Sequence, residues 1–270
     1  MKLGFVLRNM GAASDPAILA AVARAADATP GIDDLWVVDH IAIPPDQAEG
    51  SNGRYLDPLA TLAWVAGCTT RVGLGTGVLV LPYRPALPTA KWVATIQELS
   101  GGRLLLGVGV GWMEAEFRAA GVDRRSRGRV SDETLTFIDR CFAAEDDVAE
   151  AHGQAFLFRP RPPRPPLFVG GSPANAWRRA LAHRGGWIPI GLEPEALREP
   201  AQRFRAAAAV QGVPEPEIVV MTGLPLDDPG AARDRLAAFA AAGATRVVHG
   251  GRYADVDGGR RALDALAGLR

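Results

Sequence analysis

Short hydrophobic runs alternate along the chain with longer segments rich in alanine. Each short run is bounded by glycine or proline, which is typical of buried strands, and each longer segment has the length of a helix. Regular alternation of strand and helix indicates βα units and a parallel sheet that helices cover. The expected strands are Leu3–Leu7, Leu35–Asp39, Val72–Leu81, Leu104–Gly109, Leu167–Gly170, Trp187–Gly191, Ile218–Thr222 and Arg246–His249.

Eight helices are expected to follow these strands. Eight strand–helix pairs favour an α/β barrel of the (β/α)8 TIM type over an open doubly wound sheet, which has about six strands. The length of 270 residues suits such a barrel as a single domain over residues 1–270, because these barrels have about 250 residues. The expected helices are Pro16–Ala28, Pro58–Cys68, Thr89–Leu99, Ser131–Ala144, Ala174–His183, Glu195–Gln211, Gly230–Ala242 and Gly259–Leu269.

A small insertion is expected before the fifth strand. Residues 152–158 have the pattern of a hairpin, and the proline-rich stretch Arg159–Pro166 reads as a rigid connection into the strand. Asp15-Pro16 and Asp57-Pro58 are capping signals for the helices that they precede.

Charge and cysteine content narrow the classes of partner. Thirty basic residues balance thirty acidic ones, so no nucleic acid or anionic membrane is expected as a partner. Cys68 and Cys141 stand far apart and suggest neither a disulfide framework nor a metal site, which indicates a reduced, cytoplasmic chain. The first apolar run is too short for a signal segment, and none reaches the roughly 18 residues of a membrane span.

In a (β/α)8 barrel the active site lies at the C-terminal ends of the strands. The second strand ends in Asp39-His40, and several other strands end in glycines that permit a flat ligand to approach the backbone. Gly170-Gly171-Ser172 before a helix is a generic phosphate cradle. Each feature has a structural alternative, as a packing glycine, a cap or a core residue; His249 in particular reads as a core or rim histidine. Their convergence on one rim favours a binding site.

The fourth-strand region is more specific. Residues 100–104 read Ser-Gly-Gly-Arg-Leu, residues 107–112 read Gly-Val-Gly-Val-Gly-Trp, and Glu116-Phe117 and Gly121 follow. With residues 35–40, 75–78 and 168–172, this pattern resembles the bacterial luciferase-like monooxygenase superfamily, and within it the branch that uses coenzyme F420. The resemblance covers roughly residues 1–250.

The resemblance implies a deazaflavin bound in the mouth of the barrel. Asp39 and His40 would border its ring, and a bulge at Gly77-Val78, commonly with a cis peptide, would back it. Trp112 stands where some members have a glutamate that donates a proton, and Gly186 stands where many have an aspartate. The residues implied in cofactor binding are Asp39, Thr76, Gly77, Val78, Gly109, Val110, Gly111, Trp112, Gly170, Gly171, Ser172 and Arg179.

We therefore expect an oxidoreductase that transfers a hydride between F420 and a small organic substrate. His40 is the expected catalytic residue, with Asp39 as its neighbour, because imidazole exchanges protons near neutral pH. The alternatives are an FMN-dependent monooxygenase using reduced flavin and O2 and a cofactor-binding paralogue without turnover. A homodimer is expected, and a separate reductase would supply reduced cofactor.

Overall fold

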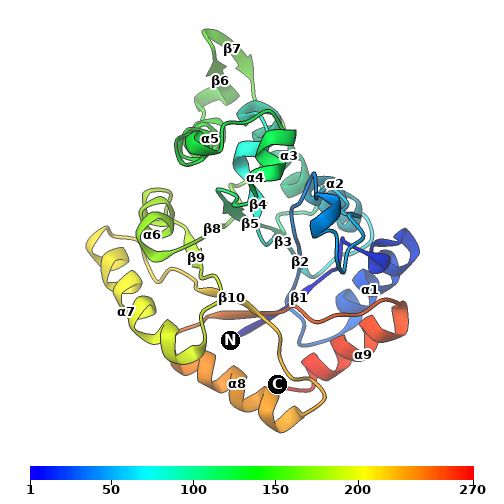
Figure 1. The fold of residues 1–270 in the computed structure, drawn as a ribbon. Coiled ribbons are helices and arrows are strands. Elements are labelled where there is room, and N and C mark those ends of the chain that lie inside the picture. Colours follow the sequence, from blue (N-terminus) through cyan, green and yellow to red (C-terminus); the bar gives the residue numbers. More distant parts are fainter.

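The computed structural model describes all 270 residues and shows a ring of parallel strands surrounded by helices (Figure 1). Neighbouring strands pair in the order β10-β11-β1-β2-β3-β5-β8-β9. A parallel bridge between Trp187 and Ile218 joins the two end strands and nearly closes the barrel. The strands are β1 (Lys2–Val6), β2 (Asp34–Val37), β3 (Gly73–Thr76), β4 (Leu79–Val80), β5 (Leu104–Gly109), β8 (Leu167–Gly170), β9 (Gly186–Ile188), β10 (Val219–Thr222) and β11 (Arg246–His249).

The helices form the outer layer. Proline occupies the first turn of α1 and α2, and Asp15 and Asp57 cap these helices by accepting backbone N–H groups, as the sequence predicts. The helices are α1 (Pro16–Ala28), α2 (Pro58–Ala66), α3 (Ala86–Leu99), α4 (Glu114–Ala119), α5 (Arg127–Phe142), α6 (Pro173–Ala182), α7 (Pro194–Val210), α8 (Pro229–Ala241) and α9 (Val256–Ala267). None of them is long and apolar enough to cross a membrane.

Three expectations about elements need correction. The expected strand Val72–Leu81 is split into β3 and β4, because the backbone bends at a cis peptide between Gly77 and Val78. The short helix α4 was not expected, and α5 begins at Arg127 instead of Ser131. Neither α4 nor α5 has a proline in its first turn, whereas α1, α2, α6, α7 and α8 do.

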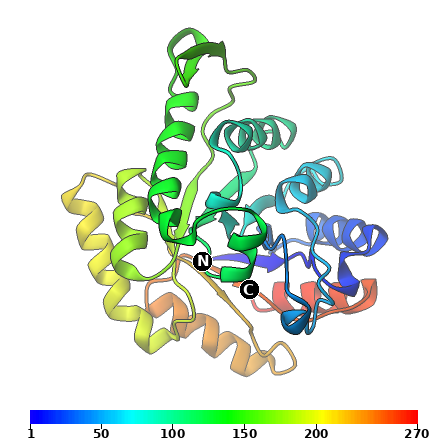
Figure 2. The ribbon, with the colours of Figure 1, turned by 45° about the horizontal axis from the view of Figure 1, so that its top comes forward.

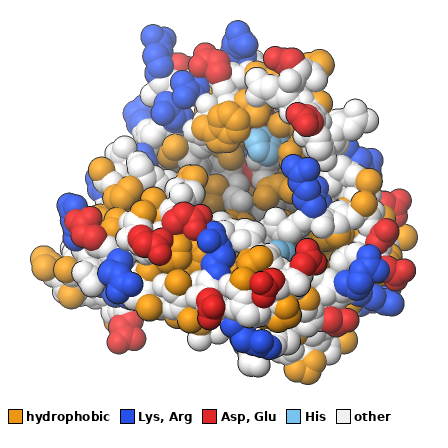
Figure 3. Space-filling model, turned by 60° about the horizontal axis from the view of Figure 1, so that its bottom comes forward, with side chains coloured by type: hydrophobic (Ala, Val, Ile, Leu, Met, Phe, Trp, Pro, Cys, Tyr) orange, Lys and Arg blue, Asp and Glu red, His pale blue; other side chains and the backbone are white.

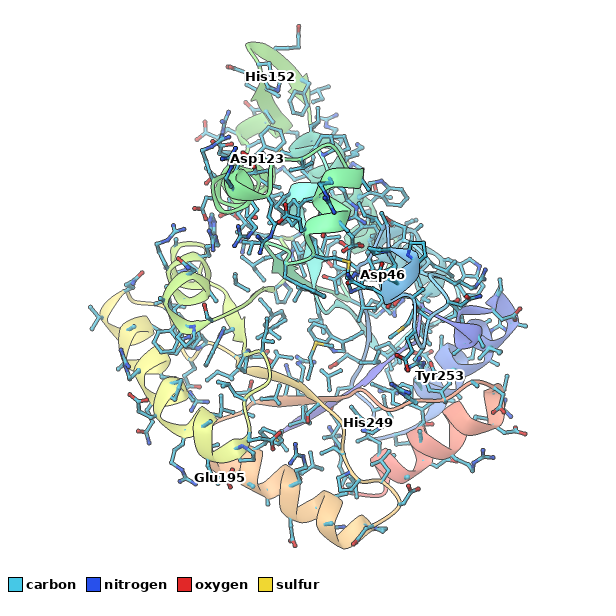
Figure 4. The ribbon with its side chains drawn as sticks, viewed as in Figure 1. Asp46, Asp123, His152, Glu195, His249 and Tyr253 are labelled. Carbon is cyan, nitrogen blue, oxygen red and sulfur yellow. The ribbon has the colours of Figure 1, made fainter.

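The expected insertion is present as a two-stranded hairpin beyond the end of α5 (Figure 2). Its strands are β6 (Val148–Ala151) and β7 (Gln154–Leu157), and the first of them was not predicted. His152 lies in the turn at the tip of the hairpin (Figure 4), far from the strand ends of the barrel.

Alternation along the strands divides their side chains between two layers. Val6, Trp36, Phe168, Ile188 and Val248 belong to one cluster inside the barrel. Their neighbours in sequence pack outward against the helices in a larger core. At the N-terminal end, inside the barrel, Arg246 pairs with Asp34 and Glu217. The opposite, C-terminal end is open.

Candidate active site at the mouth of the barrel

A cavity of about 350 Å³ opens at the C-terminal ends of the strands. Figure 3 shows a hollow surrounded by hydrophobic side chains, with a histidine at its edge. The residues that line the cavity come from the ends of seven strands, β2, β3, β4, β5, β8, β9 and β10, and from the loops that follow them. They are Val38, Asp39, His40, Gly77, Val78, Val80, Tyr83, Gly109, Val110, Gly111, Trp112, Glu116, Gly170, Gly171, Ile188, Ile190 and Met221.

One wall of the cavity is built from glycine. Gly77 directly follows β3, and Gly109 and Gly170 are the last residues of β5 and β8. A Cβ atom on Gly109 would lie 2.6 Å from Val78 Cγ2, and one on Gly170 would lie 3.0 Å from Val78 Cγ1. Because real side chains do not tolerate such approaches without a shift, glycine at residues 109 and 170 leaves the room that the Val78 side chain occupies. The Gly77–Val78 peptide is cis, as the resemblance implies.

His40 is held in the cavity wall by a buried carboxylate. Its Nδ1 lies 3.0 Å from Glu116 Oε2, and the Glu116 side chain is 1% exposed. The same oxygen accepts a hydrogen bond from the Tyr83 hydroxyl, at 3.0 Å. Glu116 Oε1 accepts the backbone N–H groups of Ile41 and Ala42. A carboxylate only accepts hydrogen bonds, so neutral His40 carries its proton on Nδ1 and leaves Nε2 free as an acceptor.

The electrostatics of Glu116 support its ionised form. Burial alone would raise its pKa, but the N–H groups of Ala42 and Ile41, together with His40, hold the pKa below its usual value. Burial and the adjacent Glu116 carboxylate raise the pKa of Tyr83, which therefore stays a neutral hydrogen-bond donor. Glu116 belongs to a motif that is recognisable in the sequence, but no sequence signal assigns Glu116 or Tyr83 to the site.

Asp39 lines the cavity, but its carboxylate is occupied. It accepts two hydrogen bonds from Arg84, at 2.7 and 2.9 Å, and one from the Val80 backbone N–H. Arg84 in turn pairs with Asp57 at the start of α2. Burial raises the pKa of Asp39 although Arg84 opposes the shift. The geometry thus makes Asp39 a support for the bend after β3 and leaves His40 as the residue with a free ring nitrogen.

A second pocket adjoins the cavity and shares Val110, Gly170 and Gly171 with it. It lies at the first turns of α5 and α6, whose N–H groups favour an anion. Three arginines line it: Arg125, Arg127 and Arg179. The Nε atom of Arg127 is buried without a hydrogen-bond partner, as expected if an anion completes this pocket.

The predicted cofactor-binding residues Gly170, Gly171, Ser172 and Arg179 all line this second pocket, and the first three are the predicted phosphate cradle. The Arg179 guanidinium already has partners within the chain, because it donates hydrogen bonds to Asp132 and to the Gly128 carbonyl. Arg125 and Arg127 were missed, since they stand in a loop whose path the sequence does not reveal.

Thr76 and Trp112, which the resemblance implies in cofactor binding, differ from each other in burial. Thr76 is fully buried and donates its hydroxyl to the Gly107 carbonyl at 2.6 Å, so it braces the glycine wall from behind. Trp112 stands at the rim, 66% exposed, with its ring edge-on to His40 at 6.4 Å. His249 is buried beneath the mouth, stacks on Phe5 and accepts the Leu224 N–H, as expected of a core histidine.

The chain matches a known protein family over almost its whole length. The family described as luciferase-like monooxygenase matches residues 1–269. An uncharacterised protein of Mycobacterium tuberculosis is 28% identical over 227 residues, which cover 76% of this chain and 77% of the relative.

Two solved structures are similar over nearly the whole chain. An F420-dependent secondary alcohol dehydrogenase in complex with an F420–acetone adduct has a TM-score of 0.81 at 16% identity, and the match covers 100% of this chain and 99% of the other. The oxygenating constituent of 3,6-diketocamphane monooxygenase from Pseudomonas putida, in complex with FMN, has a TM-score of 0.77 at 15% identity and covers 99% and 96%. At these identities the likeness establishes the fold.

Proposed function

Because the chain belongs to the luciferase-like monooxygenase family, whose members are oxidoreductases, we propose that it is an F420-dependent oxidoreductase acting on a small organic substrate. The observation that carries this proposal is the continuity of two pockets. A cavity with several glycines in its lining adjoins a pocket lined by three arginines, which suits a ring joined to a phosphate.

The residues present fit such a cofactor. The ring would lie against Gly77-Val78, where the Val78 side chain packs closely over Gly109 and Gly170. The phosphate would take the pocket of Arg125, Arg127 and the first turn of α6. When bound, a deazaflavin supplies hydride transfer; the protein supplies binding, orientation and proton handling.

In this proposal His40 handles the proton. Glu116 fixes the imidazole so that Nε2, which has no hydrogen-bond partner within the chain, is available at the cavity. In oxidation of an alcohol, Nε2 would accept the hydroxyl proton, and the hydride would pass from the carbon that bears the hydroxyl to the bound cofactor. In reduction of a carbonyl, the protonated ring would return a proton to the oxygen, and the hydride would pass from the reduced cofactor to the carbon. Glu116 stabilises the imidazolium that forms, because its carboxylate stays ionised.

FMN is the second candidate, because an FMN complex is among the solved structures with this fold. The compact chain favours F420: its one sizeable insertion is the β6–β7 hairpin, which projects away from the mouth.

Equilibrium titration of the purified chain with F420 and with FMN, each oxidised and reduced, tests the choice. We expect F420 to bind more tightly than FMN. Riboflavin, which lacks the phosphate, should bind weakly, and Arg127→Gln should weaken F420 binding at least tenfold. Tight FMN binding with none for F420 would reverse the assignment. Binding of neither would refute the function.

A further inference from the structure

Arg8 follows β1 at the mouth of the barrel and has no partner for its charge. Among the four arginines whose Nε is buried without a hydrogen bond, Arg127, Arg235 and Arg246 each bond elsewhere through Nη atoms. The Arg8 side chain forms no ion pair, and only its backbone N–H is engaged, by the Tyr253 hydroxyl. Tyr253 lies against α9 (Figure 4), so the backbone at Arg8 is fixed.

The strand register directs Arg8 into the barrel. Val6 belongs to the interior cluster, whereas Phe5 and Leu7 pack in the outer core. Alternation therefore places Arg8 on the interior face. The extended backbone continues through this residue, because Leu7 N–H donates to the Trp36 carbonyl and the Asn9 side chain bonds both backbone groups of Val38.

The depth of Arg8 matches that of the cavity. Val6 pairs with Trp36, so Arg8 stands level with Val38 on β2. Val37 pairs with Thr76, so Val38 stands level with Gly77. Val38 and Gly77 both line the cavity, so the base of the Arg8 side chain is level with these two residues, although Arg8 is not itself among the lining residues.

Arg8 also lies across the mouth from the phosphate pocket. Three strands separate β1 from β8 in either direction round the barrel, so β1 is diametrically opposite Gly170. The other interior arginine on the strands, Arg246, is at the closed end and already paired. The two carboxylates of the cavity have partners other than Arg8. Asp39 accepts from Arg84, and Glu116 accepts from its own donors, among them the Ile41 N–H.

We propose that Arg8 anchors a carboxylate of the substrate, which makes a hydroxy acid or an oxo acid the substrate class. A guanidinium is always charged, and its Nε–H and Nη–H form a planar fork that fits both oxygens of a carboxylate. β1 is adjacent to β2, so the anchored molecule would present its hydroxyl or carbonyl oxygen toward His40. The cofactor phosphate and the substrate carboxylate would then occupy opposite sides of the mouth.

The inference rests on the proposed function for its reaction, but the binding step is tested separately. The probes are cyclohexanecarboxylate and cyclohexanone, which share a ring and differ in charge. Their dissociation constants would be measured by ligand-observed NMR, on the purified chain alone and with saturating F420 or FMN, whichever binds. The variants are Arg8→Gln, Arg127→Gln for the second pocket, and Arg24→Gln, which removes an exposed positive charge on α1.

We expect the wild type to bind the carboxylate more tightly than the ketone, and Arg8→Gln to weaken the carboxylate at least tenfold while changing the ketone less than twofold. Arg24→Gln should leave the carboxylate affinity within twofold, and Arg127→Gln should do so once saturating cofactor fills the second pocket. The proposal is overturned if Arg8→Gln binds the carboxylate as the wild type does, if both probes weaken equally, or if only Arg127→Gln matters. Circular dichroism and an unchanged cofactor affinity establish that Arg8→Gln is folded. Failure of both cofactors to bind would refute the proposed function. The probe affinities of the wild type and Arg8→Gln, measured on the chain alone, would still decide whether Arg8 binds a carboxylate.

Discussion

Replacing Glu116 by glutamine should switch the neutral tautomer of His40, so that Nε2 carries the proton in place of Nδ1, without removing any contact. In the wild type, Glu116 Oε2 only accepts, so neutral His40 must hold its proton on Nδ1. The glutamine amide is expected to keep its oxygen toward the Ile41 and Ala42 N–H groups. Its NH2 group then faces His40 and Tyr83. Nδ1 must become an acceptor, and the proton moves to Nε2.

The cost in stability can be worked from the four hydrogen bonds that Glu116 accepts. Bonds to a charged group contribute about 1.5–3 kcal/mol and neutral ones about 0.5–1.5 kcal/mol, so each exchange costs about 1 kcal/mol. Removing a buried charge offsets part of this sum. We expect Glu116→Gln to lower the free energy of unfolding by about 2–3 kcal/mol. This corresponds to a fall in Tm of about 5–10 °C for a chain of this size.

The assay is 15N NMR of the imidazole side chains, which distinguishes the two neutral tautomers directly. The chain has four histidines, and His40→Gln identifies the signal of interest. Glu114→Gln is the matched control, because Glu114 lies on the same helix α4 but its side chain is 64% exposed and touches only Arg124. The control should keep the wild-type tautomer. An Nε2–H tautomer in the wild type, or an unchanged tautomer in Glu116→Gln, would refute the reasoning.

Further predictions concern the wall of the cavity, its support and the buried core. Gly109→Ala places a Cβ 2.6 Å from Val78 Cγ2, so F420 or FMN affinity should fall at least tenfold with little loss of helical circular dichroism. Asp39→Asn leaves Arg84 with one carboxylate partner, and urea unfolding should show a loss of about 2–4 kcal/mol; no loss would mean that the ion pair does not support the bend. Burial lowers the pKa of His249 to about 4, below the value near 6.5 of an unfolded chain, so the unfolded state binds more protons in this range. Stability should therefore fall as the pH drops from 7 to 4, by up to about 3 kcal/mol from this group, and His249→Phe should flatten that dependence.

The order of strands and helices follows from the sequence alone, because hydrophobic runs and breakers are local signals. The glycines at residues 77, 109 and 170 could also be placed on one rim, since the ends of parallel strands meet there. The same argument brought His40 to the mouth. Errors in the fold occurred where local signals are weak, at the bend after Thr76 and at the start of α5.

Only the tertiary structure decided which charges meet. Glu116 and His40 are 76 residues apart, and Asp39 and Arg84 are 45 apart, so no spacing in the sequence reveals either pair. The lack of any partner for Arg8 is likewise a property of the folded surroundings. The sequence by itself determined that a barrel mouth would carry glycine and histidine. The packing of its loops determined which groups there are satisfied and which remain free to bind, because hydrogen-bond partners are chosen by proximity in space.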